Sequence, residues 1–115
     1  MKYTIEQQTE ALAKASKICN LDAHITTFER KSDLHTWADR IIGIFYRKNM
    51  PVKRSYMMCS TLDMDFFFTK EGEAVYTYAG YADSRDATEE KIVNAFRIAN
   101  KMKEEMQKAI EKNDL

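Results

Sequence analysis

The fold of this chain is decided by residues 62–81, which read LDMDFFFTKEGEAVYTYAGY. Apolar and polar side chains alternate on both sides of a short polar stretch, and a period of two is typical of half-buried strands. The stretch at residues 70–73 includes Gly72, which can adopt the positive φ that a tight hairpin loop needs. The sequence therefore predicts a β-hairpin with Phe66 and Phe68 facing the core.

Further strands are expected before this hairpin. Residues 54–61 should form a strand that joins the hairpin through a tight turn at residues 60–62, or that continues into it through a bulge. Residues 23–29 are rich in β-branched side chains, which favours a short strand, but a loop remains open for them. The predicted sheet is an antiparallel meander of three strands, or of four if residues 23–29 also pair.

Three helices are predicted to cover one face of this sheet. Thr4 and Gln7 have the spacing of a capping box for a first helix that ends near Asn20. Residues 32–48 carry a wide apolar stripe and stop shortly before Pro51, which predicts a second helix. The expected fold is a single α+β domain over residues 1–115.

The third and longest helix is expected from Asp86, with Glu89 completing its capping box, to about Asn113. At 1.5 Å per residue it is ~38 Å long, more than the diameter of a compact domain of this size. Its end must overhang, bend or contact a second chain, which predicts a homodimer. The apolar stripe predicted to form the dimer interface consists of Ala99, Met102, Met106 and Ala109.

Composition and charge limit the classes of protein to which this chain can belong. The chain carries 18 basic and 18 acidic side chains, so its net charge is zero, which opposes non-specific nucleic-acid binding and favours association. No apolar run approaches the length of a membrane span, and residues 1–8 do not resemble a secretory signal. We expect a cytoplasmic protein in which Cys19 and Cys59 are thiols that behave as small hydrophobic groups.

The hairpin contains more aromatic side chains than one small core face needs for its packing. Tyr and Phe on an outer sheet face are typical anchors of a protein interface, although a helix could instead cover them. Acidic neighbours in the hairpin suit this surface to a basic partner. The predicted partner-binding residues on or near the face opposite Phe66 are Phe67, Tyr76, Tyr78 and Tyr81.

A basic strip offers a second surface. Residues 30–54 hold seven basic and two acidic side chains, whereas residues 55–90 hold two basic and eight acidic ones. The strip could bind a protein partner or, with nearby tyrosines as stacking faces, RNA. Its predicted binding residues are Arg47, Lys48, Lys53 and Arg54.

Asp63 and Asp65 are the strongest candidates for metal chemistry. If both lie on one strand, their carboxylates point to the same face and could share a divalent cation. The alternative is a solvated polar face, and neither His24 nor His35 completes a catalytic arrangement. The sequence therefore favours a non-enzymatic, homodimeric interaction module, such as an adaptor, a chaperone or a small inhibitor protein, with no cofactor. A metal-dependent small-molecule binder or enzyme and a small RNA-binding protein are the alternatives.

Overall fold

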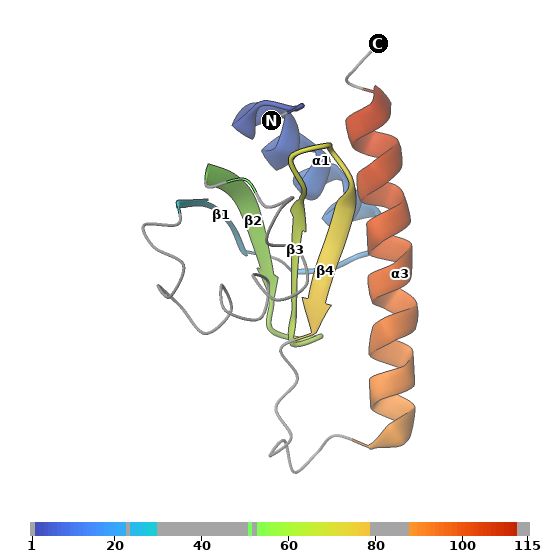
Figure 1. Cartoon of the computed structure of the whole chain (residues 1–115). Helices are drawn as coiled ribbons and strands as arrows, with labels where there is room; N and C mark the ends of the chain where they lie inside the picture. The colour runs from blue at the N-terminus through green and yellow to red at the C-terminus, as the bar shows by residue number, and fades with distance from the viewer. Residues whose placement is uncertain (1, 23, 30–50, 52, 79–87, 113–115) are drawn as a thin grey trace.

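The computed structural model describes residues 2–22, 24–29, 51, 53–78 and 88–112 (Figure 1). The helices and strands in these residues are α1 (Ile5–Ile18), β1 (His24–Glu29), β2 (Lys53–Cys59), β3 (Met64–Phe68), β4 (Ala74–Tyr78) and α3 (Glu89–Lys112). The protein is therefore α+β with a long C-terminal helix, as predicted. Of the three predicted helices, two are found here, and the one predicted over residues 32–48 lies outside the described residues.

All four strands belong to one antiparallel sheet with the order β1-β2-β3-β4. Residues 24–29, for which the sequence left strand and loop open, form β1, which pairs with β2 along its whole length. β2, β3 and β4 then follow one another in space as they do in the chain. The predicted meander is confirmed, with β1 as its fourth strand.

Two tight turns connect the strands of the meander. Asp63 closes the β2–β3 turn with φ 52°, and its N–H donates to the carbonyl of Ser60 at 3.3 Å. Gly72 has φ 85° in the β3–β4 loop, and its N–H donates to the carbonyl of Thr69 at 3.0 Å. The Gly72 backbone also lies against the ring of Tyr3, so a Cβ at this position would overlap the ring. The hairpin loop therefore uses glycine for the reason that the sequence predicted.

The capping box of α1 is formed as predicted. Thr4 Oγ1 accepts the N–H of Gln7 at 3.1 Å, and Gln7 Oε1 accepts the N–H of Thr4 at 2.8 Å. Two backbone donors at the start of the helix are thereby satisfied. The helix ends at Ile18, and Asn20 just after it adopts a positive φ.

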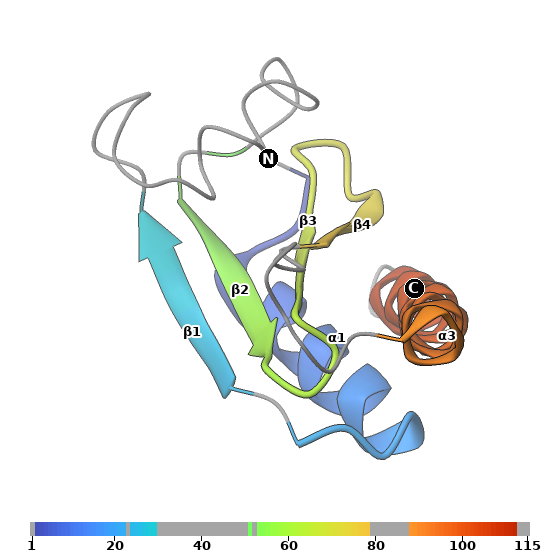
Figure 2. The ribbon, with the colours of Figure 1, turned by 90° about the horizontal axis from the view of Figure 1, so that it is seen from below.

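Both helices pack on the same face of the sheet (Figure 2). The apolar core lies between them and β2, β3 and β4. It includes Met57, Met64, Phe66 and Phe68 from the sheet, Leu12 and Ala15 from α1, and Met102, Met106 and Ile110 from α3. The opposite face of the sheet carries a second, smaller apolar cluster of Tyr56, Phe67 and Val75, with Phe28 packed against it.

The two halves of α3 differ in burial. The fully buried side chains all belong to its second half, from Ala99 to Ile110, where α3 packs along α1. From Glu89 to Ile98 no side chain is fully buried, and this end of the helix extends past the ends of the strands (Figure 1). Neither described helix combines the length and apolar character that crossing a membrane requires.

The start of α3 differs from the prediction. Thr88 caps the helix, since its Oγ1 accepts the N–H of Lys91 at 3.2 Å. The helix begins at Glu89, three residues after the predicted cap at Asp86, which lies outside the described residues. Thr and Asp are both good capping residues, but only Asp86 was predicted as the cap.

Candidate interaction surfaces

The stripe predicted to form the dimer interface is intramolecular core. Ala99, Met102, Met106 and Ala109 are all buried within one chain. They belong to the same core cluster as Leu12 of α1, and α1 packs closely along this half of α3. An apolar stripe shows only that this side of a helix is buried against another surface. Here that surface belongs to the same chain. Ala99, Met102 and Met106 are therefore not available to a second copy, and Ala109 keeps only 6% of its surface exposed.

The aromatic side chains of the hairpin do not share one face. Phe67 lies opposite Val75 on the outer face, as predicted, but its side chain is buried. Tyr76 pairs with Phe66, so it lies on the helix-facing side, where its hydroxyl donates to Asn100 Oδ1 at 2.9 Å. Its ring also packs on the ring of Phe96 in α3. The prediction that Tyr76 lies on the other face of the sheet from Phe66 was wrong.

Of the two remaining aromatic residues, the structure describes only the backbone of Tyr78. The backbone of Tyr78 ends β4, where its Cα pairs with Met64. Tyr81 lies outside the described residues. The two predicted anchors whose side chains are described, Phe67 and Tyr76, therefore lie on different faces of the sheet, and neither forms an exposed aromatic surface on the outer face.

The basic strip is also divided. Arg47 and Lys48 lie outside the described residues, and Lys53 is exposed at the start of β2. Arg54 is only 1% exposed. Its guanidinium carbon lies 4.4 Å from the centre of the Phe28 ring, and its Nη1 donates to the carbonyl of Pro51 at 3.0 Å.

The packing of Arg54 shows why it is not a surface cation. Its guanidinium lies 5.4 Å from the ring centre of Phe67 and 6.0 Å from that of Tyr56, both on the outer face of the sheet. A cation over aromatic rings is stabilised by the negative faces of the rings. Arg54 therefore packs within the outer-face cluster, where phosphate groups of RNA do not reach it.

Asp63 and Asp65 do not have the strand geometry that was predicted. Asp63 lies in the β2–β3 turn with a left-handed backbone, and β3 begins only at Met64. Burial raises the pKa of Asp65, while a hydrogen bond from the Tyr56 side chain lowers it. The described residues hold no group of three or more potential metal-ligating side chains. The expectation that both carboxylates lie on one face of a strand was wrong.

Both cysteines are thiols in the described structure. Cys59 is buried in the core and Cys19 is half-buried after the end of α1. Burial raises the pKa of the Cys19 thiol, while Lys101 lowers it and Glu105 raises it further. A neutral thiol is a poor nucleophile and a poor metal ligand, so Cys19 fits a packing role.

A groove of about 540 Å³ runs between the C-terminal ends of α1 and α3. Ile18, the last residue of α1, contributes the main apolar surface and is 49% exposed. The residues that line the groove are Lys14, Ile18, Glu105, Lys108, Ala109, Glu111 and Lys112. Lys108 pairs with Glu105 at 3.5 Å, whereas Lys14 and Lys112 form no ion pair within the described ranges.

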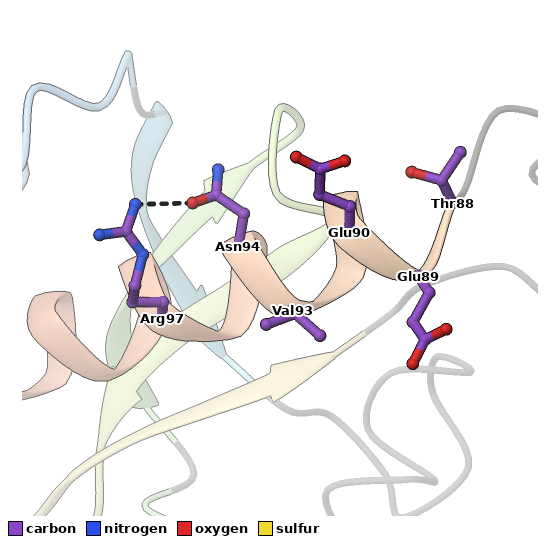
Figure 3. A pocket seen from close by; sticks show the side chains of 6 residues that line it. All are labelled: Thr88, Glu89, Glu90, Val93, Asn94 and Arg97. Atoms are coloured by element: carbon purple, nitrogen blue, oxygen red, sulfur yellow. Dashed lines mark hydrogen bonds between the residues drawn. The ribbon is translucent and has the colours of Figure 1, made fainter.

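A second hollow of about 810 Å³ lies at the start of α3 (Figure 3). It is lined by Thr88, Glu89, Glu90, Val93, Asn94 and Arg97. Val93 is 62% exposed, the highest value among the exposed large apolar side chains of the described residues. Arg97 Nη2 donates to Asn94 Oδ1 at 2.7 Å, and Figure 3 shows both side chains on the same side of the helix as Glu90.

No family model, curated protein or solved structure matches this chain. Its function must therefore be argued from its own surfaces. Neither the groove at Ile18 nor the hollow at the start of α3 was predicted from the sequence, although the sequence contains an indication of each. Ile18 is the last apolar residue of the first helix, and Val93 falls outside the apolar stripe of the last one.

Proposed function

We propose that this protein is a non-enzymatic interaction module that binds a segment of another protein in the groove between the ends of α1 and α3. The observation that supports this most is the half-exposed Ile18 in an open groove of about 540 Å³. Binding sites of this volume are common in proteins. The described residues offer no metal-ligating cluster that would favour the enzymatic alternative.

The chemistry of the groove favours an acidic amphipathic partner. Ile18 and Ala109 provide an apolar floor, on which one aliphatic or aromatic side chain of a partner could be buried. Of the five charged residues that line the groove, Lys108 pairs with Glu105 and Glu111 accepts a hydrogen bond from Gln107. Lys14 and Lys112 are exposed, and neither takes part in an ion pair within the described residues. A partner segment with an apolar side chain between two carboxylates would satisfy both features. Docking of an amphipathic segment in an apolar groove is a recurring mode of peptide recognition, and it fits an adaptor, a chaperone or a small inhibitor protein.

Photo-crosslinking in the source cell tests this proposal directly. A photoreactive phenylalanine analogue replaces Ile18 in one variant and Ala13 in the other. Ala13 is exposed on α1 and does not line the groove. We expect a crosslinked partner from position 18 and none from position 13. Adducts of equal yield from both positions, or none from either, would contradict the proposal.

Affinity measurements with the captured partner give the second test. Ile18→Asp removes the apolar floor and adds a charge that repels an acidic segment, so we expect the dissociation constant to rise at least about tenfold. Met58→Asp is the matched control, because Met58 is 46% exposed but lies on the sheet, away from the groove. It should leave the affinity unchanged. Equal affinities for the two variants would place the partner elsewhere.

A further inference from the structure

The first half of α3 presents a face that the rest of the described structure does not bury. Val93 is 62% exposed on this face, whereas Phe96 of the same half packs on Tyr76. Single exposed apolar residues are common on protein surfaces and carry no argument by themselves. The inference depends on the charged residues around Val93.

Acidic and basic residues flank Val93 at equal spacing along the helix. Glu89 lies four residues before it and Arg97 four residues after it, so the backbone positions of all three lie on one slanted stripe of the helix, from which the exposed Arg97 side chain turns towards Asn94 (Figure 3). Glu90 adds a second carboxylate on the N-terminal side. Among the described residues, Arg97 bonds only to the neutral Asn94, and neither glutamate forms an ion pair. The stripe therefore carries uncompensated charges of opposite sign on either side of an apolar residue.

We propose that a second copy of this chain docks on this stripe, with the two α3 helices antiparallel about a twofold axis at Val93. In that arrangement a residue before Val93 meets the residue equally far after Val93 in the partner. Val93 then packs on its own counterpart, and Glu89 of each copy meets Arg97 of the other. The stripe is self-complementary, as an isologous twofold interface requires.

The charges also determine the orientation. A parallel pair would place the glutamates of one copy on those of the other and would bring the two arginines together. Like charges at such distances oppose association, so only the antiparallel pair is favoured. The zero net charge of the chain adds no long-range repulsion between copies.

The size of the contact limits its strength. From Glu89 to Arg97 the stripe rises ~12 Å along the helix, which is smaller than the contact of a standard stable interface. The dimer should therefore dissociate in the micromolar range or above, and association should depend on protein concentration. It uses a different surface from the groove at Ile18, so one chain can bind a copy of itself and another partner at once.

Sedimentation velocity from about 10 μM to about 1 mM protein tests the dimer. We expect the mass to rise from that of a monomer towards twice 13.5 kDa for the natural chain. Val93→Asp should remain monomeric throughout, and its fold should be unchanged because Val93 is exposed. Met58→Asp and Ile18→Asp, which alter the other two exposed large apolar side chains of the described residues, should leave the dimer intact.

A charge exchange tests the register. Arg97→Glu should abolish the dimer, and so should the double variant Glu89→Arg, Glu90→Arg. An equimolar mixture of these two variants should associate again, because the carboxylates of the first variant then meet arginines of the second at both ends of the stripe. A monomer at all concentrations, a dimer that survives Val93→Asp, or failure of the mixture to associate when the natural chain dimerises would overturn the proposal.

Discussion

The side-chain amide of Gln107 in α3 binds the backbone of Ala74 at the start of β4. Gln107 Oε1 accepts the N–H of Ala74 at 2.8 Å, and Gln107 Nε2 donates to the carbonyl of Gly72 at 3.1 Å. β4 is the last strand of the sheet, so this N–H has no neighbouring strand on that side. The helix side chain satisfies it and ties the hairpin to α3.

Replacing Gln107 with Leu should destabilise the protein. The change keeps similar bulk but removes both hydrogen bonds and leaves the N–H of Ala74 unsatisfied, which costs about 1–3 kcal/mol. Glu104→Leu, at an exposed position of the same helix, should change stability by no more than about 0.5 kcal/mol. Urea unfolding followed by circular dichroism compares the two, and equal midpoints would show that the bonds to the hairpin add nothing.

Met106→Glu should prevent folding instead of dissociating a dimer. Met106 is fully buried within one chain, and an unpaired carboxylate there would lose its hydration. Met106→Leu preserves the apolar volume, so it should cost less than about 1.5 kcal/mol. Far-ultraviolet circular dichroism measures both variants. A folded Met106→Glu protein would mean that this side chain reaches solvent.

Gly72→Ala should destabilise the hairpin loop. An alanine at φ 85° is strained by about 1–2 kcal/mol, and its Cβ would also overlap the ring of Tyr3, which raises the total. Glu71→Ala, one residue earlier in the same loop and exposed, is the control and should be near neutral. Thermal melts report the difference, and a shift no larger than that of the control would show that the loop relaxes freely.

The stability of the protein should carry a pH dependence from Asp65. Because burial raises its pKa in the folded state, this carboxyl loses its proton less readily when folded than when unfolded. Its contribution therefore falls as pH rises through the interval between 3.8, the unfolded value, and the higher folded pKa. Asp65→Asn removes this titration but keeps an acceptor for the Tyr56 hydroxyl.

The comparison is made as a difference between two proteins. Urea unfolding from about pH 3 to about pH 7 should show the Asn variant gaining stability relative to the natural chain as pH rises. The contributions of all other carboxyl groups to the free energy of unfolding are common to both proteins and cancel in the difference. A difference that stays constant with pH would show that Asp65 titrates alike in the folded and unfolded states.

Local features of the fold were predictable because short stretches of sequence determine them. The Thr4–Gln7 capping box, the Gly72 loop and the alternation within each strand all depend on neighbours in the chain. The relative phase of β3 and β4 was not predicted, because a shift of one residue in pairing exchanges the two faces of a strand. This shift is why Tyr76 lies beside Phe66 and not beside Phe67.

The site residues were harder to predict because their environment depends on tertiary packing. The alternation in β2 gives the same pattern whether Arg54 reaches solvent or packs under Phe28. Likewise, the spacing of Met102 and Met106 is the same whether α1 or a second chain covers them. Only the folded arrangement shows that α1 covers the second half of α3 and leaves its first half open.

The unequal burial of α3 separates two kinds of constraint along one helix. Substitutions at the buried positions from Ala99 to Ile110 change the fit of the core, so selection for folding acts on them. Substitutions at the exposed positions between Glu89 and Arg97 change mainly the surface that the helix offers to other molecules. Recognition can therefore diverge among descendants of this chain while the residues that hold the fold stay the same.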